Sequence, residues 1–238
     1  MLVRQGEHRG VSADRSLAWS LAGIAGAVNA AGFYAAGLYS SHMTGTVSTM
    51  ADHLALGEMG AFGMALAIVA TFIAGAMVSA MLINAGQRRG LSAIYAYSVC
   101  LEALLLAGLG AADVWLHELR GAALVMGLSF LMGLQNAIVT RISNARVRTT
   151  HVTGMITDIG IELGNLIDDL YHRNSRDRVR VTLDKLKTHL PTVGSFFLGG
   201  VLGVLGYSAW GAMLFVTLAV ILAGFAAPVI VAEWRTAE

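Results

Sequence analysis

The sequence predicts an all-α, polytopic helical membrane protein with about six transmembrane helices plus two short or half-inserted helices, arranged as two inverted repeats. Three observations predict this fold. The 238-residue chain is 56% hydrophobic and only 13% charged, and a soluble domain carries about 25% charged residues. Six stretches approach the roughly 20 apolar residues that a helix needs to cross a bilayer. Three short motifs also recur in the same order in the two halves of the chain.

The six predicted spans are rich in Ala, Gly, Leu and Val. They are 17–39, 61–85, 92–112, 119–140, 191–208 and 211–232. Glycine is common inside them, which suits close helix packing in lipid. The first apolar run is too long for the core of a signal peptide, so we expect an uncleaved first helix. The single cysteine, Cys100, excludes a disulfide scaffold and a Cys-based zinc site.

Two further segments, 42–57 and 151–167, are long enough to cross the membrane but carry acidic residues. Charge placement favours six spans, because Lys and Arg concentrate in cytoplasmic loops. With six spans and a cytoplasmic N-terminus, 15 of the 16 Lys and Arg residues lie inside, and only Arg120 lies outside. If both weak segments also cross, the split becomes 11 to 5. We therefore predict six spans with both termini cytoplasmic, and eight spans stays open.

This topology divides the chain into two membrane repeats with short flanking segments. The predicted parts are a cytoplasmic N-terminal tail (1–16), repeat 1 (17–112), a short outer loop (113–118), repeat 2 (119–232) and a cytoplasmic tail (233–238).

Repeat 2 contains a basic insert at 168–189. Its apolar residues recur at helical spacing among six Lys and Arg residues. We expect a basic amphipathic helix that contacts anionic lipid headgroups at the cytoplasmic surface, and a solvated regulatory loop is the alternative. Nucleic acid is not an expected partner, because only Tyr171 is available to stack on a base.

The repeat rests on three pairs of matching segments. Residues 26–30 match 133–137, residues 42–45 match 151–154, and residues 72–75 match 196–199. A shared bias towards Gly and Ala is the alternative explanation. Because each half has three spans, an odd number, the second half is predicted to be inverted relative to the first. Many secondary transporters have this plan, with short or interrupted helices at matching positions forming the binding site.

The paired Thr-Gly motifs fit the starts of two such helices. Thr44-Gly45 lies in the first weak segment and Thr153-Gly154 in the second. Thr can cap a helix, Gly lets the backbone approach closely, and a helix N-terminus presents N–H groups to an anion. A plain cap on an interfacial helix is the alternative. His42 and His151 precede the motifs, but their spacing does not favour a metal site, and no cofactor is expected.

Polar residues within the spans complete the candidate path. Asn29 and Asn136 lie centrally in equivalent spans, where they serve either helix packing or solute contact. Glu102 lies midway along its span, and an ionisable residue there suggests function; a neutral or hydrogen-bonded carboxyl group is the alternative. Further candidate proton or ion sites lie on polar stripes of the weak segments: Asp52, Asp158 and Glu162.

The motifs also carry a family resemblance. Gly-x-x-Asn-Ala followed by Ser41 to Gly45, and the second copy with Thr150 to Gly154, resemble the YoaK family of bacterial membrane proteins, also called DUF1275. The resemblance implies a small inner-membrane protein of about six spans, without an established substrate. Asn29 stands where that family often has Asp, and Thr46 where Asn is common. If the family couples transport to protons through that Asp, the resemblance implies that this chain has lost or moved the step.

The sequence contains none of the common motifs of nucleotide-driven pumps, hydrolases or zinc proteases. We therefore expect a secondary transporter or channel for a small solute, working by alternating access between the repeats. An anionic solute fits the helix N-termini. The alternative is a membrane-embedded enzyme or a lipid-binding accessory protein. A chain of this size is also compatible with a homo-oligomer, although no motif demonstrates one.

Overall fold

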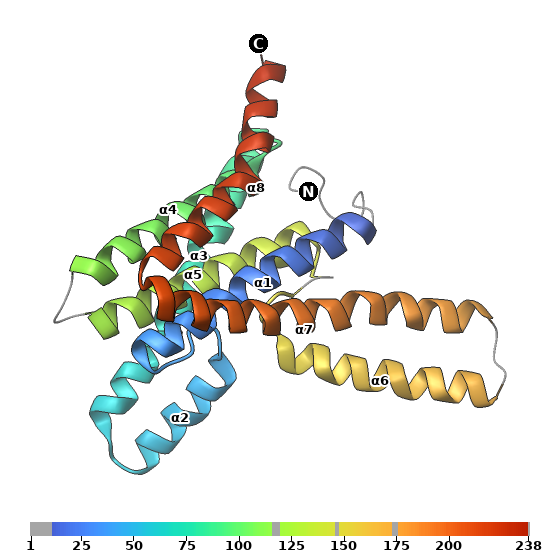
Figure 1. The fold of residues 1–238 in the computed structure, drawn as a ribbon, viewed down its shortest axis with the longest axis horizontal. Coiled ribbons are helices and arrows are strands. Elements are labelled where there is room, and N and C mark those ends of the chain that lie inside the picture. Colours follow the sequence, from blue (N-terminus) through green and yellow to red (C-terminus); the bar gives the residue numbers. More distant parts are fainter. Residues whose placement is uncertain (1–10, 116–119, 146–147, 173–175, 238) are drawn as a thin grey trace.

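The computed structural model describes residues 11–115, 120–145, 148–172 and 176–237 (Figure 1). Within these ranges it contains helices and no strands. The helices are α1 (Val11–Ala36), α2 (Met43–Ala55), α3 (Met59–Arg88), α4 (Ile94–Trp115), α5 (Arg120–Ile142), α6 (Val152–Tyr171), α7 (Arg176–Trp210) and α8 (Met213–Ala237). Residues 1–10 of the predicted tail, half of the predicted outer loop (116–118) and Arg173 of the basic insert lie outside the described residues.

Six of the helices are long and apolar enough to cross a membrane, and they are α1, α3, α4, α5, α7 and α8. They correspond to the six predicted spans, so the polytopic helical fold is confirmed. Glycines in the left-handed region end two of the spans. Gly37 has φ 77° and Gly211 has φ 55°, a conformation that costs glycine little and stops the helix. The first span therefore ends at Ala36 and not at residue 39.

The basic insert differs from its prediction as a separate segment. Its first residues end α6, and the residues from Arg176 onwards form one continuous helix with the following span. This helix, α7, has 35 residues and passes through Pro191. It stays helical through the proline because α6 and α1 pack along it, and tertiary packing outweighs local propensity.

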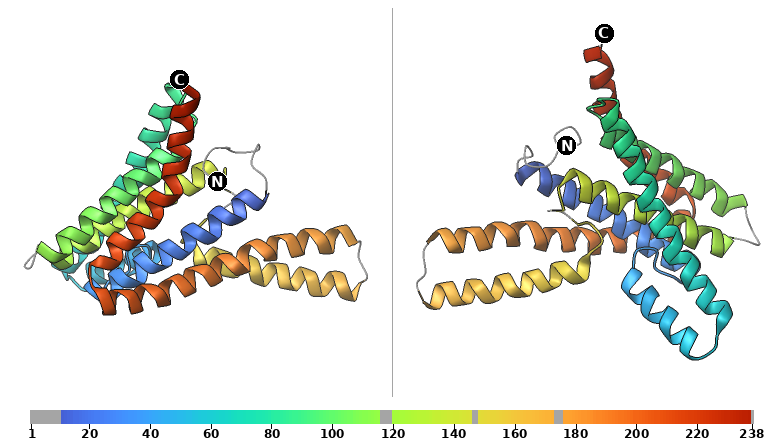
Figure 2. Two further views of the ribbon diagram at one scale, coloured as in Figure 1. Left: turned by 45° about the horizontal axis from the view of Figure 1, so that its top comes forward. Right: turned by 180° about the vertical axis from the view of Figure 1, so that it is seen from behind.

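The spans pack in three pairs, and each pair joins a helix of the first half of the chain to a helix of the second half. α1 packs on α7, α3 on α5, and α4 on α8. α1 and α5 also contact each other, and most of their spanning windows is buried, so they form the centre of the bundle. Two hairpins, α2 with α3 and α6 with α7, project from this centre in different directions (Figures 1 and 2).

Glycines allow the helices of two of these pairs to cross with their backbones in contact. A Cβ at Gly26 would overlap the carbonyl oxygen of Phe196, and a Cβ at Gly199 would overlap that of Gly23. The other crossing has the same arrangement, with Gly133 on the carbonyl of Phe72 and Gly75 on that of Phe130. Small residues permit such close approach in membrane helices. The α1–α7 and α3–α5 crossings thus use corresponding residues of the predicted repeat.

Large apolar side chains cover the outer helices. On α3, Met77 and Met81 are 59% and 66% exposed, and on α7 Phe197 and Leu202 are 67% and 66% exposed. A soluble protein rarely exposes so large an apolar surface. Contact with lipid hydrocarbon accounts for these side chains and agrees with a membrane protein.

Candidate functional site

The chain folds back along α1 before α2 begins. Asn29 is buried on α1, seven residues before the end of that helix. Its Oδ1 accepts hydrogen bonds from the backbone N–H of Ser41 at 3.0 Å and from the Ser41 hydroxyl at 2.9 Å. The hydroxyl of Ser40 lies 3.5 Å from the same oxygen. Asn29 therefore holds the connection against the side of its own helix.

The same arrangement occurs in the second half. Asn136 lies six residues before the end of α5. Its Oδ1 accepts a hydrogen bond from the hydroxyl of Thr150 at 2.7 Å, and its Nδ2 donates to the carbonyl of Met132 at 2.7 Å. Ser41 and Thr150 occupy matching positions, one residue before each His-x-Thr-Gly motif. The two predicted asparagines thus bind corresponding connections.

These two contacts set where α2 and α6 begin. A helix rises about 1.5 Å per residue, so six or seven residues correspond to roughly 10 Å. Each connection therefore returns about 10 Å along the preceding span before the next helix starts. α2 then packs along α3, and α6 packs along α7. Both weak segments are helices that begin part-way along a neighbouring span.

Histidine, and not threonine, stands at the start of each of these helices. The N-cap residues are His42 and His151, and neither makes a side-chain capping bond. Thr44 and Thr153 lie within the first turn, and the prediction that they cap the helices is wrong. A Cβ at Gly45 would overlap the His42 ring, and one at Gly154 would lie 2.5 Å from Nδ1 of His151. The glycine leaves room for the histidine ring to fold over the first turn.

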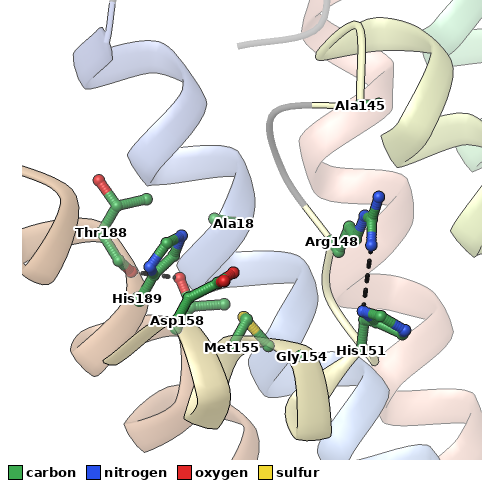
Figure 3. A pocket seen from close by; sticks show the side chains of 10 residues that line it. Ala18, Ala145, Arg148, His151, Gly154, Met155, Asp158, Thr188 and His189 are labelled. Carbon is green, nitrogen blue, oxygen red and sulfur yellow. Dashed lines mark hydrogen bonds between the residues drawn. The ribbon is translucent and has the colours of Figure 1, made fainter. Parts of the chain in front are cut away.

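A pocket of about 380 Å³ lies beside the start of α6 (Figure 3). Its walls come from α1, α6, α7 and the connection that precedes α6. The lining residues are Ala18, Ala145, Arg148, His151, Gly154, Met155, Asp158, Thr188, His189 and Thr192. Two of the predicted site residues, Gly154 and Asp158, therefore face a shared space.

Cationic and polar groups surround this pocket. Arg148 and His151 lie 3.2 Å apart, Nη1 to Nδ1, at one side of it. From α1, Arg15 donates through Nε to the hydroxyl of Thr188 at 3.0 Å and through Nη2 to the carbonyl of Asp184 at 2.7 Å. In Figure 3, His189 and Asp158 lie next to each other, and the Arg148–His151 pair lies on the other side of Met155.

A buried acid–histidine pair joins α6 to α7 behind the pocket. Oε1 of Glu162 lies 3.0 Å from Nδ1 of His189, and their side chains are 7% and 22% exposed. Oε2 of Glu162 and Nδ1 of His189 are both buried and make no hydrogen bond among the described residues, so the two side chains form an ion-pair contact by distance alone. A third predicted residue, Glu162, is therefore linked to the pocket through His189.

Other predicted residues lie elsewhere. Thr44 and Asp52 are exposed on α2, with Gly45 half-buried between them, and α2 does not pack extensively on α6 within the described part of the chain. Glu102 is buried on α4, which packs on α8 and α5, and its Oε2 has no hydrogen-bond partner among the residues described. The structure gathers three second-half candidates, Gly154, Asp158 and Glu162, and leaves Thr44, Asp52 and Glu102 apart from them.

Sequence reasoning missed His189, Arg148 and Thr188. Thr188 and His189 stand where the basic segment meets the apolar span, and Arg148 stands just before the second His-x-Thr-Gly motif. A polar residue at the junction of a charged helix and a span can be used to pick out candidate site residues. Its meaning, however, depends on α6 packing along α7, which the sequence does not reveal.

No group of three or more His, Cys, Asp or Glu side chains in the described ranges could hold a metal ion. Comparison with curated proteins and with solved structures gives no match. A family model described as a protein of unknown function, DUF1275, matches residues 17–227. The match begins within α1 and ends within α8, so it includes both asparagine contacts and the pocket. The chain therefore belongs to the DUF1275 family.

Proposed function

We propose that this protein is a secondary transporter for a small anionic solute, in which residues 17–112 and 119–232 are inverted repeats that alternate access to a solute site between them. Both termini are cytoplasmic in this proposal, and the membrane is the bacterial inner membrane. The chain acts without catalytic chemistry.

One observation carries the proposal: the connections held by Asn29 and Asn136 return about two turns along their spans before α2 and α6 begin. In a six-span topology, α1 ends outside and α5 ends inside. α2 then starts from the outer side of the membrane centre and α6 from the inner side. Two helix starts that approach the centre from opposite faces are the arrangement found around solutes in inverted-repeat transporters.

The matched helix crossings support the same proposal. α1 on α7 and α3 on α5 are equivalent pairs if the first four helices correspond to the last four. α4 on α8 is then a pair that maps onto itself. A rocking motion of one repeat against the other requires contacts of this reciprocal kind.

The pocket supports an anion as the solute. Arg148 carries a positive charge at its edge, His151 lies beside it, and Gly154 in its wall belongs to the first turn of α6. Backbone N–H groups at a helix start attract negative charge. Asp158 on the opposite wall limits the net positive charge, which favours release as well as binding.

The inverted arrangement is tested by labelling single cysteines at the hairpin tips. In a Cys100→Ser background, Leu56→Cys and Tyr171→Cys place thiols at positions that are 72% and 82% exposed. A membrane-impermeant reagent is expected to label position 56 in intact cells and position 171 only in inside-out vesicles. Labelling of both positions from the same side would overturn the inverted repeat.

The transport itself is tested by anion concentration jumps on proteoliposomes held on a solid-supported membrane. The probes are chloride, nitrate, acetate, phosphate and sulfate. We expect a current for at least one of them that Arg148→Gln abolishes and that Arg235→Gln, an exposed arginine remote from the pocket, preserves. Absence of current for every probe, or equal currents in both variants, would contradict an anion transporter with this pocket.

A further inference from the structure

Glu162 is a buried carboxyl group with an incomplete set of hydrogen bonds. Its side chain is 7% exposed, one oxygen lies 3.0 Å from Nδ1 of His189, and the other has no partner within the described structure. Burying a carboxylate costs several kcal/mol unless it is paired, hydrogen-bonded or neutral. A proton on the pair removes that cost, because it leaves either a salt bridge or two neutral groups.

The groups around the pair come from every neighbouring element. α6 contributes Asp158, one turn before Glu162, and α7 contributes Asp184, Lys185 and Thr188. Arg15 of α1 contacts Thr188 and Asp184. The connection before α6 supplies Arg148 and His151. The carboxylate of Asp184 is engaged by Arg15 and Lys187, so His189 is the cationic partner that the structure gives to Glu162.

The pair is in contact with the solute pocket. His189 is both the partner of Glu162 and a lining residue, and Asp158 lies beside it in the same wall (Figure 3). A proton can reach His189 from water in the pocket and return to it. An anion in the pocket stabilises a positive charge on His189, and a proton on His189 attracts the anion.

The described part of the first half has no equivalent pair at the matching positions. By the spacing of the matched motifs, Glu162 corresponds to His53 and His189 corresponds to Ala65. His53 contacts Glu58 at 2.5 Å, but that pair is exposed at the α2–α3 tip. Among the described residues, the buried acid–histidine pair thus distinguishes the second half from the first.

We infer that Glu162 and His189 form the proton-binding site of this protein, loaded through the α1–α6–α7 pocket and coupled there to anion binding. This inference deepens the proposed transport function and rests on it for the coupling. The step moves one proton between pocket water and the pair, with no other bond made or broken. It also assigns proton binding to the second repeat and not to Glu102.

Infrared difference spectroscopy of the full-length protein in nanodiscs tests proton binding directly. Lowering the pH is expected to produce the carbonyl stretch of a protonated, buried carboxyl group, which Glu162→Gln removes. His189→Gln is expected to retain this band and to move the frequency of its carbonyl stretch, because the carboxyl group loses the imidazole that lies 3.0 Å from its Oε1. Glu58→Gln, which disrupts the exposed pair, is the matched control and leaves the band unchanged.

Two results would overturn the inference. The first is a band that survives Glu162→Gln, which would place the proton on another acid such as Glu102. The second is a band that His189→Gln does not move. If Glu162→Gln fails to fold, as judged by size-exclusion chromatography, the His189→Gln spectrum still decides the outcome.

Flux measurements separate this inference from the proposed function. In proteoliposomes, the dependence of the anion current on an imposed pH gradient is expected to be lost in Glu162→Gln and kept in Glu58→Gln. A carbonyl band that Glu162→Gln removes, without any anion current, would support the proton site and contradict transport. An anion current with no Glu162 band would leave transport standing and contradict the proton site.

Discussion

At the scale of single residues, five glycines limit how closely the spans approach. Each of them faces a backbone atom of the crossing helix, and they are Gly26, Gly75, Gly133, Gly199 and Gly203. A backbone carbonyl cannot move aside as a flexible side chain can, so any larger residue must separate the helices. Other glycines, such as Gly63 on α3, have open space around them and carry no such requirement.

Gly133→Ala is therefore expected to destabilise the protein by about 1–3 kcal/mol, the usual cost of overpacking. The matched variant Gly63→Ala is expected to be neutral or slightly stabilising, because alanine favours a helix. Thermal unfolding in detergent, followed by tryptophan fluorescence, measures both. Equal melting temperatures for the two variants would show that the α3–α5 crossing is looser than described.

A second residue-scale prediction concerns the His-x-Thr-Gly motif. Gly45→Ala places a methyl group where the His42 ring lies, so it is expected to lower the melting temperature. His42→Ala removes the obstacle, and the double variant is expected to recover most of the loss. This positive coupling in a double-mutant cycle distinguishes ring packing from a need for glycine's backbone freedom. If the two effects simply add, the histidine is not the reason for the glycine.

At the scale of elements, two carboxylates hold the two ends of α4 against different helices, one against α8 and one against α7. Near the end of α8, Oε1 of Glu233 accepts hydrogen bonds from the N–H of Ser92 at 2.6 Å and of Ala93 at 3.0 Å. Near the end of α4, Oδ2 of Asp113 accepts one from the hydroxyl of Tyr207 at 2.6 Å. The start of α4 is thus held to α8, and the end of α4 is held to α7.

Glu233→Gln is expected to loosen the start of α4. Glutamine keeps the shape but loses the charge that strengthens bonds to the unpaired N–H groups of a helix start. Hydrogen exchange monitored by mass spectrometry is expected to increase for the peptide containing Ser92 and Ala93 and to stay unchanged for α6. Unchanged exchange at the α4 start would show that Glu233 contributes nothing measurable there.

The elements also show what a sequence can predict here. The six spans follow from runs of apolar residues, and the importance of Asn29 and Asn136 follows from their matching positions. The join between the basic insert and α7 was not predictable from Pro191, which by itself suggests a break. His189 was not predictable as a partner of Glu162, because 27 positions of chain and one helix reversal separate them. Local composition determines where the spans lie, whereas long-range packing brings Glu162 and His189 together.

At the scale of the whole molecule, α7 is longer than a bilayer is thick. Its 35 residues extend about 52 Å at 1.5 Å per residue, against a hydrocarbon core of about 30 Å. If Gly199 at the α1–α7 crossing lies near the membrane centre, Lys185 and Lys187 fall at headgroup level. The earlier residues, Arg176 and Arg178, then lie in water beyond the headgroups.

This placement separates two groups of basic residues by their contact with lipid. We expect Lys185→Gln with Lys187→Gln to reduce the anionic phospholipid retained through purification, since a basic residue at the surface contributes about 1 kcal/mol. Arg176→Gln with Arg178→Gln is expected to leave retention unchanged. Native mass spectrometry of bound lipids compares the variants. The reverse order would mean that the α6–α7 hairpin lies flat on the membrane.

The pairing of α1 with α7 and of α3 with α5 also means that neither half of the chain contains its own core. Expressing the chain as two fragments, divided between α4 and α5, would leave each fragment with two helices whose glycine-lined surfaces lack the helix that packs on them. Neither fragment should accumulate alone, whereas co-expression should restore a folded complex, because each supplies the surfaces that the other lacks. An ancestral protein of half this length would have met the same need with a second copy of itself.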